Sequence, residues 1–86
     1  MATEAKIGVV TDYYAKIGVA AITLSDGAVA VGDTIRVRGH TTDFTQAVDS
    51  LQVEHKAVER AERGTEVAVR VRERVRKHDD VLVVRG

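Results

Sequence analysis

Cysteine and tryptophan are missing from this 86-residue sequence, and its aromatic side chains are limited to two tyrosines and one phenylalanine. Without cysteine, neither disulfide bonds nor thiolate metal ligands can support the fold, and nothing marks an oxidising compartment. The metal-binding signature H-E-x-x-H is also missing. We therefore expect a cytoplasmic protein without a metal or a cofactor, which relies on its apolar core for stability.

Long apolar runs are missing too. The longest runs, at residues 17–22 and 81–84, are far shorter than the about 20 residues that a membrane-spanning helix needs. The amino terminus has neither the apolar stretch nor the cleavage pattern of a signal peptide. We therefore expect no membrane among the partners of this protein.

Two further absences limit the function. The phosphate-binding loop G-x-x-x-x-G-K-[ST], whose amides and lysine hold a nucleotide, does not occur, and this excludes nucleotide hydrolysis of that kind. An excess of one charge is also missing, because 13 basic residues balance 13 acidic ones. A balanced chain has no overall field to attract nucleic acid, which argues against a generic polyanion binder.

The sequence is rich in valine, and its apolar residues alternate with polar ones. Ile35 and Val37, for example, alternate with two arginines, which is typical of a strand with one buried face. The pairs Asp26-Gly27 and Gly32-Asp33 predict tight turns, and an Asp-Gly pair is a strong hairpin signal. The pattern predicts six strands, at residues 7–14, 19–24, 34–38, 46–55, 66–72 and 81–85.

The connections are predicted from polar residues and glycine. Residues 39–44 form a polar loop, with Phe44 plugging the core beside it. A β-bulge near Asp49 and Ser50 explains why the apolar positions of that strand depart from a period of two. Residues 56–63 are expected to form a loop with one helical turn.

Short strands separated by turns favour an all-β fold. We predict one domain over residues 1–86, a small six-stranded antiparallel β-barrel of Greek-key type, with residues 1–5 frayed. Closure into a barrel removes exposed sheet edges, which would otherwise pair with other chains.

The turn residues carry a resemblance that covers about residues 7–84. They are Gly18, Gly27, the triplet Val31-Gly32-Asp33, Gly64 followed by Val67 and Val69, and Asp79 with Val81. This pattern resembles the second, β-barrel domain of elongation factor Tu and related translation GTPases. It resembles most closely the small translation elongation factor-like proteins, and also the similar barrels attached to collagenase-like peptidases. In elongation factors this barrel holds the aminoacylated end of tRNA or contacts ribosomal RNA, so the resemblance implies a binding role without a catalyst.

A basic stretch is the most concrete functional feature. Alternate residues of a strand share a face, so Arg70 and Arg72 should project together. Guanidinium groups arranged in this way suit RNA phosphates. The alternative is a solvated strand face that glutamates on neighbouring strands neutralise. The RNA-binding candidates are Arg36, Arg38, Arg70, Arg72, Arg74, Arg76 and Lys77.

A second candidate is the loop His40, Thr41, Thr42 and Asp43. A histidine and an aspartate three residues apart more often stabilise a turn than bind a metal. His55 and His78 lack a ligand set, so a small enzyme is disfavoured.

Two binding functions then remain. The first is a non-enzymatic module that binds RNA or a ribonucleoprotein, such as the ribosome, through a basic strand face. The alternative is a protein-interaction module that docks on a larger enzyme or associates with its own copy.

Overall fold

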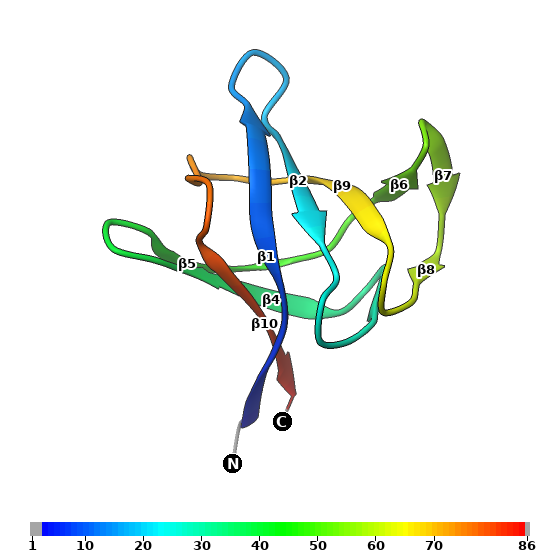
Figure 1. Cartoon of the computed structure of the whole chain (residues 1–86), viewed down its shortest axis with the longest axis horizontal. Coiled ribbons are helices and arrows are strands. Elements are labelled where there is room, and N and C mark those ends of the chain that lie inside the picture. Colours follow the sequence, from blue (N-terminus) through cyan, green and yellow to red (C-terminus); the bar gives the residue numbers. More distant parts are fainter. Residues whose placement is uncertain (1–2, 86) are drawn as a thin grey trace.

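The computed structural model describes residues 3–85, and within this range the regular structure consists of strands alone. Figure 1 shows their arrangement, in which the first strand begins beside the end of the last strand. The ten strands are β1 (Thr3–Tyr14), β2 (Val19–Thr23), β3 (Val29–Ala30), β4 (Thr34–Arg38), β5 (Asp43–Ala47), β6 (Leu51–Val53), β7 (Lys56–Val58), β8 (Arg60–Ala61), β9 (Glu66–Arg70) and β10 (Asp80–Arg85).

Eight strands form one sheet in the order β5-β4-β10-β1-β2-β9-β6-β7, and β3 pairs with β8 in a second, two-stranded sheet. All of the pairs are antiparallel. The long strand β1 lies in the middle of the large sheet, between β10 and β2. The prediction of a small all-β, antiparallel fold is therefore confirmed.

The predicted six strands and their predicted closure into a barrel are not confirmed. The large sheet has two ends, β5 and β7, and among residues 3–85 no strand pairing joins them into a closed barrel. The predicted strand at 46–55 is two strands, because residues 48–50 leave the sheet and the Val48 amide donates instead to the Asp33 carbonyl, at 2.8 Å. The sequence pattern mistook this break for a bulge.

Two connections also differ from their predictions. Residues 56–63 contain the short strands β7 and β8 instead of a helical turn. The strand β7 pairs with β6, which precedes it directly, and β8 pairs with β3, which lies much earlier in the chain. The turn at Asp26-Gly27 exists, but the strands on either side of it, β2 and β3, belong to different sheets. The segment expected to fray, residues 1–5, is paired with β10 from Thr3 onward, and residues 1–2 lie outside the described range.

The long strand β1 bends at two irregularities in its register, one between Lys6 and Gly8 and one between Val10 and Asp12. Gly8 lies so close to β2 that a Cβ atom there would overlap the Thr23 carbonyl. Bulges of this kind bend a strand and increase its twist. The sheet can therefore curl around its inward side chains.

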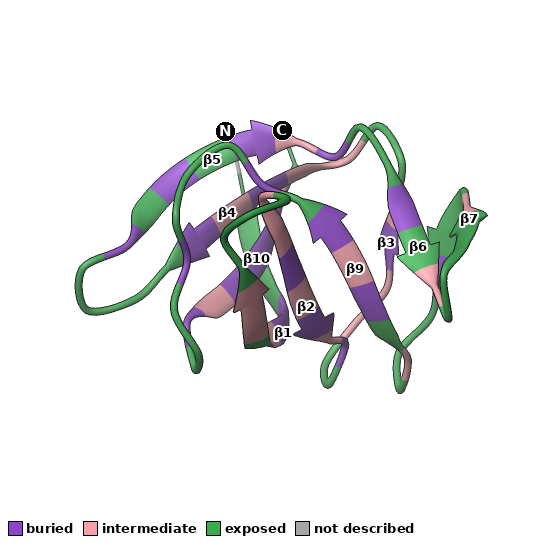
Figure 2. Cartoon of the chain, turned by 90° about the horizontal axis from the view of Figure 1, so that it is seen from above, coloured by how far each residue is buried: buried purple, intermediate pink, exposed green. Residues whose placement is uncertain are grey.

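The core is built from the alternation that the sequence predicts. Ile35 and Val37 on β4 are buried, and so are Val67 and Val69 on β9. Figure 2 shows buried and less buried residues alternating along β2, β4 and β9. Phe44, the single phenylalanine, is also buried in this core, as predicted.

A buried polar side chain connects one end of the large sheet to the strand that lies five places away in it. Gln46 on β5 is 4% exposed. Its Nε2 donates to the Arg70 carbonyl at 2.8 Å, and its Oε1 accepts from the Arg72 amide at 2.7 Å. One side-chain amide thus supplies the donor and the acceptor that a neighbouring strand would supply.

Replacing Gln46 with methionine tests this link. Gln46→Met keeps the length of the side chain but leaves the Arg70 carbonyl and the Arg72 amide without their partners. Since each such group costs about 1–3 kcal/mol, we expect the free energy of unfolding to fall by about 2–4 kcal/mol, measured by urea denaturation. The matched control, Gln52→Met on an exposed position of β6, should change it by less than about 0.5 kcal/mol. Equal losses in the two variants would contradict the assignment.

Candidate functional site

The predicted basic residues come from three segments of the chain. Arg36 and Arg38 lie on β4, whereas Arg70 ends β9, and in the order of the large sheet three strands, β10, β1 and β2, lie between these two. The remaining candidates, Arg72, Arg74, Arg76 and Lys77, are exposed on the connection between β9 and β10.

That connection, residues 71–79, is not a continuation of the strand. Val71 and Val75 are buried beneath it, and the buried Asp79 accepts the Arg76 amide through Oδ2 at 2.9 Å. The Asp79 carboxylate also faces Gly39, where a Cβ atom would overlap it. The exposed cations therefore project from a loop that the buried side chains of Val71, Val75 and Asp79 hold in place.

Arg36 is already occupied by carboxylates. Its Nε and Nη2 donate to the two oxygens of Asp43 at 2.8 Å each, and its Nη1 donates to Glu4 at 3.0 Å. These bonds, with Asp43 first, raise the pKa of Arg36, and the Arg36 hydrogen bond holds the pKa of Asp43 below its ordinary value. Since the folded pKa of Asp43 is lowered, this contribution is present at neutral pH and is lost as acid protonates the carboxylate.

The loop of His40, Thr41, Thr42 and Asp43 has a structural explanation. The Gly39 amide donates to the Thr42 carbonyl at 2.7 Å, which closes a tight turn between β4 and β5. Thr42 is buried, and Asp43 begins β5 and binds Arg36. Across residues 3–85, no three histidine, cysteine, aspartate or glutamate side chains come together as a metal site would require.

A groove that the sequence did not reveal lies on the outer side of the large sheet. Its floor is a row across three neighbouring strands, Ala21 on β2, Ala68 on β9 and Gln52 on β6, which are paired in register. Because alanine side chains are small, the surface is recessed along this row, and the cavity above it measures about 570 Å³. The lining residues are Tyr14, Ala21, Gln52, Val53, Glu54, His55, Gly64, Thr65, Glu66, Val67 and Ala68. We call this surface the alanine groove.

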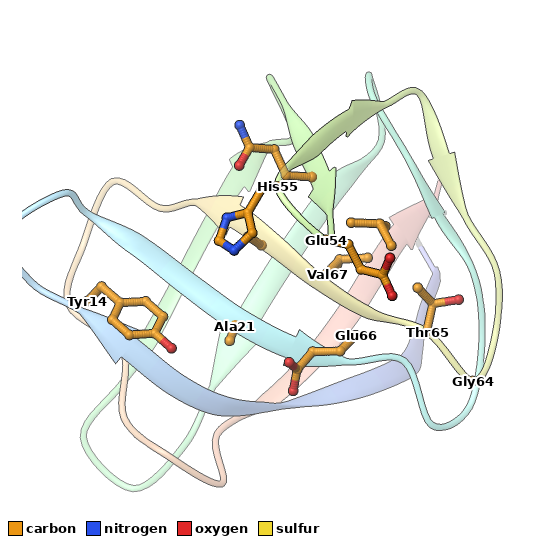
Figure 3. A pocket seen from close by; sticks show the side chains of 11 residues that line it. Tyr14, Ala21, Glu54, His55, Gly64, Thr65, Glu66 and Val67 are labelled. Carbon is orange, nitrogen blue, oxygen red and sulfur yellow. The ribbon is translucent and has the colours of Figure 1, made fainter.

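Figure 3 shows Tyr14 at one side of the alanine groove and Glu54 and Thr65 at the other, with Ala21 between them. A smaller hollow of about 130 Å³ shares Gln52 and Ala68 with the groove and continues it to Arg70. The outward alanines of β2 and β9 are visible in the sequence as small residues at strand positions. Their alignment is not visible there, because it depends on which strands become neighbours.

Carboxylates surround the alanine groove. Glu54 and Glu66 line it, and Asp12 lies close enough to act on Tyr14 at its other side. Within residues 3–85 none of these three carboxylates forms an ion pair. Repulsion by Asp12 is the largest cause that raises the pKa of the Tyr14 phenol, and Glu66 adds to it.

The phenol of Tyr14 can report this negative field. In a Tyr13→Phe background, so that one tyrosine titrates, we expect the ultraviolet titration of Tyr14 to have its midpoint above the ordinary value of 10.0. Asp12→Asn should move the midpoint back toward that value, and Glu66→Gln should move it less. A midpoint that neither substitution lowers would show that the carboxylates do not act on this ring.

The turn between β6 and β7 holds the rim of the alanine groove in an uncommon conformation. Glu54 and His55 have φ values of 51° and 65°, in the left-handed region that favours glycine. Two-residue hairpin turns of this kind prefer Asn-Gly. The chain therefore places two long, charged or polar side chains where the backbone alone favours small ones.

Relief of this conformation should stabilise the protein. A residue other than glycine loses about 1–2 kcal/mol in the left-handed region, so we expect His55→Gly to raise the free energy of unfolding by about 0.5–1 kcal/mol, measured by urea denaturation. Glycine's greater freedom in the unfolded chain reduces the gain. As a control, Ala57→Gly on the neighbouring strand β7 should lower the stability by about 0.5–1 kcal/mol.

An apolar tip protrudes at the turn between β1 and β2. Tyr14 is 50% exposed and Ile17 is 61% exposed at the turn between β1 and β2, which stands out from the body of the sheet in Figure 1. Gly18, with φ at 64°, closes this turn. Large exposed apolar side chains at a protruding turn are suited to contact with another protein surface.

Comparisons with known proteins point to proteases. The chain is 38% identical over 81 residues to an uncharacterised protease of Methanocaldococcus jannaschii, and the match covers 93% of this chain and 20% of that protein. It is 34% identical over 68 residues to a collagenase of Porphyromonas gingivalis, with 78% of this chain and 19% of the collagenase covered. The chain thus spans about a fifth of the length of these relatives. No protein-family model matches it.

Among solved structures, the fold is similar to the C-terminal domain of a putative U32 peptidase of Geobacillus thermoleovorans. The TM-score is 0.84 at 19% sequence identity, and the alignment covers 90% of this chain and 89% of that domain. At this identity the similarity concerns the fold. It shows that a domain of this shape occurs at the end of a larger protein.

These matches correct the resemblance drawn from the turn residues. The relatives found are a protease and collagenases, so identification with the translation elongation factors is wrong, and the RNA-binding function that followed from it loses its support. The similarity to barrels attached to collagenase-like peptidases agrees with the matches.

In residues 3–85 there is also no helix long and apolar enough to cross a membrane.

Proposed function

We propose that this chain is a non-catalytic docking domain of a U32-type peptidase, which binds the catalytic region of such an enzyme. The observation that carries the proposal is the 38% identity to one fifth of a protease. The other four fifths of that protease have no counterpart here and are the natural place for its catalytic groups. The similar fold of a U32 peptidase C-terminal domain supports the same function.

The apolar tip formed by Tyr14 and Ile17 is the proposed contact with the catalytic region. Contacts between domains need apolar side chains that neighbouring residues do not already cover, and the β1–β2 turn offers two of them. The cations of the 71–79 connection are then solvent-exposed charges on a separate loop. They increase the polarity of that surface without being required for docking.

Binding to a catalytic region tests the proposal. The Methanocaldococcus jannaschii protease can be expressed without its matching 81-residue segment and titrated with this chain in a calorimeter. We expect saturable binding, no peptidase activity of this chain alone, and binding about tenfold weaker for Ile17→Asp, because a charge would be buried at the contact.

Two controls make the result decisive. Val31→Asp introduces the same charge at another exposed apolar position, away from the β1–β2 turn, and should leave the binding unchanged. The protease's own excised segment serves as the positive control. If that segment binds the truncated protease and this chain does not, the proposed function is wrong.

A further inference from the structure

The alanine groove has charges of opposite sign at its two ends. Glu54 and Glu66 line one end, and Arg70 lines the smaller hollow at the other. Glu66 and Arg70 begin and end the same strand, β9, so their Cα atoms are about 13 Å apart at about 3.3 Å per residue. The groove therefore has a direction, and that direction is defined by charge.

The floor between these charges allows close approach. Ala21, Ala68 and Gln52 form the row, and the two alanines present only methyl groups to the groove. Gln52 adds an amide that can donate and accept hydrogen bonds. A flat segment with its own backbone amides fits such a surface, whereas a bulky apolar ligand would leave the polar rim unpaired.

The Glu54 end favours a cationic side chain. The two glutamates have no ion-pair partner within the described part of the chain. Glu66 is oriented by the Thr11 hydroxyl, which donates to its Oε2 at 3.2 Å. Phosphate-bearing ligands would be repelled by the same carboxylates.

We propose that the alanine groove binds an extended peptide segment that has a lysine or arginine followed by a carboxylate. The cationic side chain lies between Glu54 and Glu66. The backbone crosses the row of Ala21 and Ala68, and the carboxylate pairs with Arg70. This inference goes beyond the docking function and does not rest on it, because docking is assigned to the tip of the β1–β2 turn.

The probe is the peptide Gly-Gly-Lys-Ala-Ala-Ala, labelled with fluorescein at its amino end and free at its carboxyl end. Three residues after the lysine span about 10 Å, and the lysine stem adds the remaining reach. Two altered peptides accompany it, one with norleucine in place of lysine and one with a C-terminal amide. We expect fluorescence anisotropy at low salt to show each alteration weakening binding about threefold to tenfold, and added salt to weaken the parent peptide further.

Variants of the protein assign each charge to its place. Glu54→Gln with Glu66→Gln should weaken the binding of the lysine peptide, and replacement of lysine by norleucine should then have no further effect on binding. In Arg70→Gln the C-terminal amide should likewise have no effect on binding, as expected when two groups interact directly. Ala68→Phe should fill the groove and weaken all three peptides. The matched control is Glu59→Gln with Glu73→Gln, which removes two exposed negative charges outside the groove.

Thermal unfolding of each variant confirms that it is folded before binding is compared. Equal affinity for the three peptides, or equal losses in the glutamate pair and its control, would overturn the proposal. So would a dimer of this chain that Ala68→Phe dissociates, since the groove would then be occupied by a second copy. Ile17→Asp should leave peptide binding intact, and Glu54→Gln with Glu66→Gln should leave docking intact. The failure of one proposal is therefore distinguishable from the failure of the other.

Discussion

The two hydrogen bonds of Gln46 are the constraint on which the rest of this fold depends. They connect β5, an end of the large sheet, to the backbone that leaves β9. A chain of this size buries only about 60% of the surface that it exposes when unfolded, so a buried polar group without a partner would be costly. Within the described residues, every buried side-chain nitrogen or oxygen has a hydrogen-bond partner. The two bonds of Gln46 give hydrogen-bond partners to the Arg70 carbonyl, to the Arg72 amide and to the side-chain amide of Gln46 itself.

The link ends on the strand that carries the surface that we assign to binding. That strand, β9, pairs with β2 and β6, and its outward Ala68 lies in line with Ala21 and Gln52. The charges of this small protein then separate into two environments. Arg36 is enclosed by Asp43 and Glu4, whereas the carboxylates around Tyr14 remain without cations. A balanced composition therefore conceals a strong local field.

The resemblance to elongation factors shows how turn residues can mislead about function. Gly32 has φ at 96°, and the Asp33 carboxylate accepts the Ala30 amide at 3.0 Å, so the Val31-Gly32-Asp33 triplet is required by the turn between β3 and β4. A residue that a turn requires recurs wherever that turn occurs, whatever the protein binds. The triplet indicates the kind of fold, and the longer match shows that the chain is similar to one fifth of a protease.

The sequence by itself determined which side chains of β4 are buried, because alternation with a period of two is local: Ile35 and Val37 are in the core as predicted. It also determined the turn at Gly32-Asp33, where the chemistry lies within a few residues. Only the tertiary structure decided which strands become neighbours. That order puts Arg36 and Arg70 on different strands, divides the predicted strand at 46–55, and aligns Ala21 with Ala68. Pairing of distant strands depends on contacts far apart in the chain, so the groove, unlike the core, could not be read from the residues in order.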